Sequence, residues 1–229
     1  MEFDDVIRTT FAAREFTSDP VPDEVLWQIL DTARFAPSGG NRQGAHVIVV
    51  RDDAVKARIA ELSKPAARRY LAQRRAGENP WNTVHDTAIT EADLADVRGV
   101  DEFVAPLSAA PLLLVVTVDL AVVAAMDSEL DRVGIVGGAS IYPLVWNILT
   151  AARAYGFGGT ITTMASAQEP GMQELLGVPD PNAIAAVLPI GRPVKQLTRL
   201  RRESVSDFVT IGRFDGEPLG GAPGDESGE

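Results

Sequence analysis

APSGGNRQ, residues 36–43, separates two stretches of the chain whose apolar residues recur with different periods. Before it, apolar side chains recur at helical spacing, which predicts an amphipathic helix over residues 23–36. After it, a short run of β-branched residues predicts a strand over residues 46–51. A plain turn is one interpretation of the connection, because Gly adopts unusual dihedral angles and Pro fixes one. The density of polar and small residues leaves a binding role open as well.

Helical and strand patterns alternate along the rest of the chain. We expect further helices at about 2–10, 54–74, 91–98, 133–155 and 171–176, and further strands at 112–118, 157–163 and 183–190. This alternation indicates an α/β or α+β fold around one central sheet. The segment 76–105 has little periodicity apart from its short helix, and an irregular segment of that length is typically mobile or functional.

The composition narrows the possible functions. The 229 residues suggest one domain, and 45% hydrophobic with 23% charged residues is typical of a globular protein. The chain has no Cys, which excludes disulfides and thiolate catalysis, and its two His do not suggest a metal site. Although the net charge is −11, basic residues cluster at 64–75 and 192–202, which favours a bound anion over a nucleic-acid surface.

Two segments of the sequence indicate where in the cell the protein is located. The N-terminus lacks the apolar core of a signal peptide, so we expect a cytoplasmic protein. The uncharged run 133–152 is long enough to cross a bilayer, but Gly and polar residues interrupt it and no basic flank frames it. We interpret it as a helix buried all round, within the protein or at a subunit interface, and expect no membrane partner. The acidic residues 215–229 are predicted to form a disordered tail.

No conventional catalytic group stands out in the sequence. Ser140 lacks the G-x-S-x-G frame of a nucleophile, and the glycines around it lie within a predicted helix rather than after a strand.

Four motifs taken in order nevertheless resemble the nitroreductase family of FMN-dependent enzymes. They are REFTSDPVPDEV, APSGGNRQ, YPLVWNILTAARAYGFGGTITTM and LPIGRP, followed by an arginine-rich arm, and the resemblance runs from about Val6 to about Phe214. It implies an α+β, three-layer fold with a central, mostly antiparallel sheet flanked by helices. It also implies one FMN-binding domain over residues 1–214, and a homodimer that exchanges its C-terminal arms. Both active sites would lie at the subunit interface, with the helix 133–155 as the dimer core.

The resemblance carries over to individual residues. It assigns no catalytic side chain, since FMN carries the reaction. It implies FMN contacts from Arg14, Pro37, Ser38, Gly39, Asn41, Gln43, Thr162, Thr163, Arg201 and Arg202. The family's R-S-x-R-x-F motif is incomplete here, because Phe11 and Ala12 stand where a basic residue and a hydroxyl are usual; phosphate binding then depends more on Arg201 and Arg202. Trp81, in the lid-like excursion 76–105, is expected to stack on or shield the acceptor.

The function implied by the resemblance is hydride transfer from NAD(P)H, by a ping-pong mechanism, to a small nitroaromatic or quinone. Other flavin chemistry on the same fold, such as dehalogenation or flavin breakdown, is an alternative. A non-catalytic FMN-binding protein is another. The sequence does not separate NADH from NADPH.

Overall fold

The computed structural model describes residues 1–220 of the chain, which divides into two compact units, Met1–Leu197 and a second that begins at Thr198. The helices of the first unit are α1 (Phe3–Thr9), α2 (Asp23–Ala33), α3 (Asp53–Arg75), α4 (Glu91–Ala95), α5 (Val100–Ala109), α6 (Tyr142–Ala154) and α7 (Glu169–Leu176). Its strands are β1 (Ala45–Val50), β2 (Leu112–Asp119), β3 (Gly158–Gly159) and β4 (Asn182–Gly191). The second unit contains the short helix α8 (Val205–Phe208).

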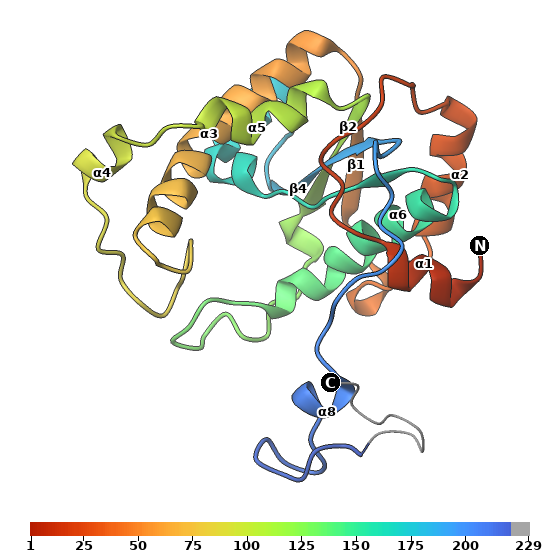
Figure 1. Ribbon diagram of the computed structural model, residues 1–229, viewed down its shortest axis with the longest axis vertical. Coiled ribbons are helices and arrows are strands. Elements are labelled where there is room, and N and C mark those ends of the chain that lie inside the picture. Colours follow the sequence, from red (N-terminus) through yellow and green to blue (C-terminus); the bar gives the residue numbers. More distant parts are fainter. Residues whose placement is uncertain (221–229) are drawn as a thin grey trace. The chain divides into compact units, whose positions relative to one another are not determined.

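The four strands form one sheet in the order β1-β2-β4-β3, and each strand is antiparallel to its neighbours. Helices cover both faces of this sheet (Figure 1). Because side chains alternate along a strand, β2 sends Leu112, Leu114 and Val116 to one cluster and Leu113 and Val115 to another. The predicted α+β fold of three layers with a mostly antiparallel sheet is therefore confirmed.

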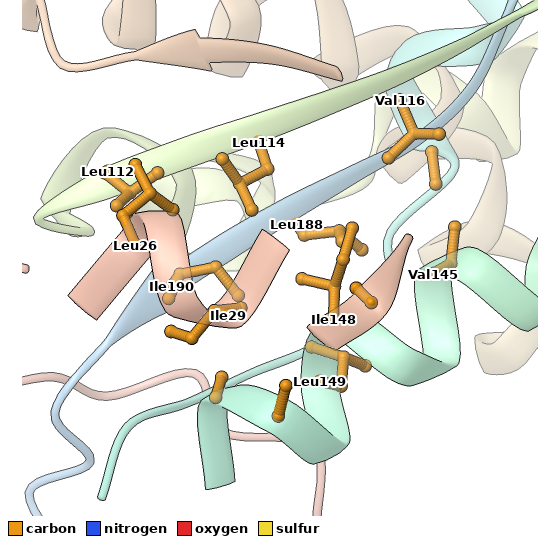
Figure 2. Close-up of a cluster of buried hydrophobic side chains, with 14 of the residues drawn as sticks. Leu26, Ile29, Leu112, Leu114, Val116, Val145, Ile148, Leu149, Leu188 and Ile190 are labelled. Carbon is orange, nitrogen blue, oxygen red and sulfur yellow. The ribbon is translucent and has the colours of Figure 1, made fainter. Parts of the chain in front are cut away.

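The first of these clusters packs the sheet against α2 and α6. Figure 2 shows Leu26 and Ile29 of α2, with Ile148 of α6, facing the apolar side chains of β2 and β4. The second cluster packs the other face against α3 and α5, and Ile59 and Leu107 belong to it. All apolar positions of β2 are buried, as expected for a strand covered on both faces.

The uncharged run was predicted to be helical over residues 133–155, with Pro143 either as a kink or as the real start of the helix, and the second alternative is confirmed. The α-helix begins at Tyr142, with Pro143 in its first turn, where a missing N–H breaks no hydrogen bond. The preceding residues Val136–Ser140 form a short 3₁₀ helix instead. Gly137 and Gly138 lie in it, and glycine lowers the propensity for an α-helix.

Within one chain, this helix is buried on one face, and its role as the dimer core stays a prediction. Ile148 is fully buried inside the core of its own chain, whereas Trp146 is 41% exposed on the other side of α6. Within residues 1–220, no helix combines the length and apolar character needed to cross a membrane.

The predicted excursion 76–105 is shorter than expected, because α5 begins within it. Val100, Val104 and Leu107 recur at helical spacing and are buried against α3. The irregular part comprises residues 76–90, and α4 follows it with a capping box between Thr90 and Asp93. The predicted strand 157–163 is likewise reduced to Gly158–Gly159 and a single bridge from Thr162 to Val187.

In the second unit, residues 209–219 fold back on themselves through a bridge between Thr210 and Pro218. Phe208 and Phe214 are exposed in it. Residues 221–229 of the acidic tail lie outside the described residues, so the tail and the exchange of arms stay predictions.

A buried carboxylate organises the loop between β2 and α6. Asp127 is 4% exposed and accepts hydrogen bonds from the Ile135 backbone N–H at 2.8 Å and from the Arg132 guanidinium at 2.7 Å. The Ile135 N–H, together with Arg132, lowers the pKa of Asp127 to about 2. The ionised form of Asp127 therefore stabilises the folded loop.

We expect this stabilisation to be complete above about pH 4 and to be lost as the pH falls toward 2, because the folded-state pKa lies below the ordinary value. Urea unfolding of the wild type and Asp127→Asn should show a difference in midpoint that is large near neutral pH and shrinks with acidification. Asp131→Asn, an exposed position in the same loop, should behave like the wild type. A difference that does not vary with pH would contradict this role.

Candidate active site

A cavity of about 470 Å³ lies between the segment after α1, the helices α3 and α5, and the residues that follow β3. It brings together three of the predicted site residues, Arg14, Thr162 and Thr163. The remaining lining residues are Glu15, Tyr70, Glu102, Phe103, Val104, Pro106, Leu107, Thr160, Ile161, Met164 and Pro189. We refer to it as the Arg14 cavity.

Backbone pairing explains why Arg14 lies beside residues 160–164. The Ala13 N–H donates to the Gly159 carbonyl at 3.0 Å, which holds the N-terminal segment along β3. Beyond β3, Thr162 and Val187 exchange two hydrogen bonds, at 3.0 and 2.8 Å. Successive N–H groups of an extended chain face opposite sides, so those of Ile161 and Thr163 face away from β4. Neither has an acceptor among the described residues.

The lining of the Arg14 cavity therefore includes a guanidinium and two backbone N–H groups close to apolar and aromatic side chains. Arg14 Nη1 donates to the Ala12 carbonyl at 3.3 Å, and the carboxylates of Glu15 and Glu102 also line the cavity. A donor set of a guanidinium and N–H groups suits a flat ring system whose edge carries carbonyl or anionic oxygens. The residues present fit a flavin on these grounds. Among residues 1–220, no group of three or more His, Asp or Glu side chains could hold a metal ion.

The APSGGNRQ loop contains strained backbone that a plain turn does not require. Gly40, Asn41 and Gln43 have φ values of +59°, +52° and +51°, in the left-handed region that non-glycine residues seldom adopt. Two hydroxyls stabilise this conformation: Ser38 Oγ accepts from the Gln43 N–H, and Ser140 Oγ accepts from the Gly39 N–H, both at 3.0 Å. Strain of this kind at non-glycine residues is concentrated at functional sites.

This loop does not line the Arg14 cavity. Pro37, Ser38 and Gln43 line a separate cavity of about 170 Å³, together with Ser140 and Leu144. Arg201 and Arg202 belong to the second unit, where both are exposed and Arg202 Nη1 donates to the Arg201 carbonyl at 2.7 Å. Within the first unit, Arg14 and the Ser38 loop thus line different cavities.

Trp81 lines a third cavity, of about 550 Å³, which shares Tyr70, Thr163 and Met164 with the Arg14 cavity. Its backbone N–H donates to Gln73 Oε1 at 3.0 Å, and Gln73 Nε2 donates to Glu78 at 3.1 Å. The Thr87 hydroxyl and the Ala88 N–H also donate to Glu78, and with Gln73 they hold its pKa below the usual range. These contacts tie the irregular segment 76–90 to the end of α3.

A sequence model of the nitroreductase family matches residues 7–192, most of the chain. The chain belongs to the nitroreductase family. Among curated relatives, the NADH dehydrogenase of Thermus thermophilus is 28% identical over 185 residues, covering 80% of this chain and 82% of the relative. The iodotyrosine dehalogenase 1 homolog of Caenorhabditis elegans is 26% identical over 203 residues, covering 82% of this chain but 58% of the relative.

The fold comparison agrees with this membership. An iodotyrosine deiodinase solved with FMN and 3-iodo-L-tyrosine matches with a TM-score of 0.64 and 21% identity. The match covers 93% of this chain and all of the solved one. At that identity, the likeness shows a shared nitroreductase fold.

Sequence reasoning missed three residues that shape these cavities. Tyr70 and Phe103 form an aromatic pair with ring centroids 5.4 Å apart in the wall of the Arg14 cavity. Helical periodicity over residues 100–107 was the signal that could have placed Phe103. Ser140, examined only as a nucleophile, instead supports the loop at Gly39, and no local pattern indicates a contact across that separation.

Proposed function

We propose that this protein is an FMN-dependent oxidoreductase that takes hydride from NAD(P)H and passes it, by a ping-pong mechanism, to a small nitroaromatic or quinone. The observation that carries this proposal is the Arg14 cavity, whose lining combines a cation with N–H groups that have no acceptor among the described residues, in a chain of the nitroreductase family. When bound, FMN supplies the hydride chemistry, which is consistent with the lack of a recognisable protein nucleophile.

The residues of the cavity have separate roles in this proposal. Arg14 stabilises negative charge at an oxygen-bearing edge of the flavin or at its phosphate, and the N–H groups of Ile161 and Thr163 donate to the ring. Tyr70 and Phe103 form an apolar wall that excludes water from the ring. The acceptor needs little recognition beyond stacking in such a site.

A complete site requires a second copy of the chain in this proposal. The Ser38 loop and Arg14 line different cavities of one chain, so a homodimer would bring the loop of one subunit to the Arg14 cavity of its partner. Exposed apolar residues on α6 and the loop before it offer the interface. They are Met126, Leu130, Val133, Ile135, Val136, Tyr142 and Trp146. Patches of this kind commonly mark subunit contacts. Exchange of the C-terminal arms would supply Arg201 and Arg202, and we place the enzyme in the cytoplasm.

Reductive dehalogenation is the second candidate. Its support is the similarity to the Caenorhabditis elegans dehalogenase homolog and the fold match to iodotyrosine deiodinase. Nitro or quinone reduction and reductive dehalogenation both use a reduced flavin. They differ in the acceptor that oxidises it.

The test is an absorption spectrum of the purified protein, followed by additions in the absence of oxygen. We expect a yellow protein that bleaches with NADPH or NADH and recolours with a quinone or nitroaromatic. Recolouring only with 3-iodo-L-tyrosine would favour dehalogenation instead. A protein that binds FMN but does not oxidise NAD(P)H steadily with any acceptor would be a flavin-binding protein. A protein that FMN cannot reconstitute would overturn the proposal.

A further inference from the structure

The cavity beside Trp81 has aromatic walls and continues from the Arg14 cavity. Trp81 and Tyr70 line it, with Pro80 and Ser166, while Thr163 and Met164 border both cavities. A ligand there would extend away from the segment that we assign to the flavin ring. At about 550 Å³, the cavity is large enough for a substituted benzene ring.

Two arginines stack on the aromatic residues of this cavity. The Arg69 guanidinium carbon is 4.4 Å from the centroid of the Trp81 ring, and that of Arg74 is 6.0 Å from the centroid of Tyr70. Neither arginine forms an ion pair with any residue in the described part of the chain. The carboxylate of Glu78 attracts Arg69 but already accepts bonds from Thr87, Ala88 and Gln73. Two guanidinium groups without an ion-pair partner in the described residues therefore stack on the aromatic residues of this cavity.

Two polar atoms in this region also lack partners. Arg69 Nε and Ser166 Oγ are buried and make no hydrogen bond within residues 1–220. Ser166 lines the cavity, and Arg69 is stacked on one of its walls. Buried donors nearly always have an acceptor, so water or a bound ligand supplies one at each of these two atoms.

We propose that the Trp81 cavity binds the anionic group of an aromatic acceptor, with its ring against Trp81 and Tyr70 and its carboxylate next to Arg69. This inference rests on the proposed function and specifies its substrate class: small aromatic carboxylates bind in preference to neutral aromatics. The hydroxyl of Ser166, which lines the cavity, donates to the same group. Arg69 acts as a specificity-determining residue.

Equilibrium binding tests the inference without any turnover. Titration calorimetry of the full-length, FMN-containing protein, with no reductant present, would compare 4-nitrobenzoate with 4-nitrobenzamide, which have similar shapes but different charges. We expect 4-nitrobenzoate to bind about tenfold more tightly, the size of effect expected for one charge-assisted hydrogen bond. Arg69→Met should abolish this preference, because methionine keeps an apolar stem on Trp81 but removes the charge.

The matched control is Arg58→Met, which removes the same charge from an exposed position on α3 and should leave the preference intact. Equal affinities of the wild type for the two compounds would overturn the inference, and this comparison holds even if Arg69→Met fails to fold. A folded Arg69→Met variant that keeps the preference would also overturn it, as would displacement of 4-nitrobenzoate by inorganic phosphate at similar concentration. Failure to oxidise NAD(P)H would count against the proposed function alone, since binding is measured separately.

Discussion

Trp146→Asp is expected to convert the proposed FMN-containing homodimer into monomers that have lost most of their FMN. Trp146 is 41% exposed on α6 and lies outside the core of its own chain, so the subunit should still fold. A carboxylate at the centre of an apolar interface is desolvated without a partner, and aromatic residues commonly dominate such interfaces. Because Arg14 and the Ser38 loop line different cavities of one chain, separated subunits would each hold only part of the FMN site.

Light scattering coupled to size-exclusion chromatography would measure the mass, and the absorbance ratio of flavin to protein would measure FMN content. Circular dichroism would establish that the variant is folded. Val84→Asp is the control, since Val84 is 80% exposed on the segment 76–90 and lines none of the cavities described above; it should stay dimeric and yellow. A folded Trp146→Asp variant that remains a dimer would show that this face of α6 is not the interface.

Ile148→Ala, on the opposite face of the same helix, should instead reduce the stability of the fold. Ile148 is fully buried between the sheet and α2 (Figure 2), where deletion of its side chain would leave a cavity that surrounding residues fill poorly. Such substitutions lower the free energy of unfolding by about 2–5 kcal/mol. Denaturant unfolding at a fixed protein concentration would measure the loss, because dimerisation makes apparent stability depend on concentration.

Leu144→Ala is the matched control for this loss. Leu144 lies one turn earlier on α6 and is only partly buried, so its truncation should cost clearly less. Equal losses at the two positions would contradict the difference between the complete burial of Ile148 and the partial burial of Leu144. A stable monomer with Ile148→Ala would contradict the assignment of Ile148 to the core of its own chain.

Sequence patterns correctly located the helices and strands whose pattern of burial is regular. Leu112–Asp119 is apolar at nearly every position because helices cover both of its faces, and its assignment as a strand was right. The helix Asp53–Arg75 was also right, since helical propensity and a capping Asp52 agree there. Patterns failed where a local signal was ambiguous. The segment before Tyr142 is uncharged like the helix that follows it, but its glycines do not form an α-helix. The short amphipathic helix Val100–Ala109 was not recognised because irregular sequence precedes it.

The amino-acid sequence by itself determined the family, because four motifs in a particular order over most of the chain depend only on residue identity and spacing. Only the tertiary structure decided which of those motifs meet. Strand pairing placed Arg14 beside Thr162 and Thr163, whereas the Ser38 loop came to lie against Ser140 and away from them. It also decided that Ile148 faces the core and Trp146 the surface. Hydrophobic periodicity is local, but contact between distant segments depends on how helices and strands pack, and no short stretch of sequence encodes that arrangement.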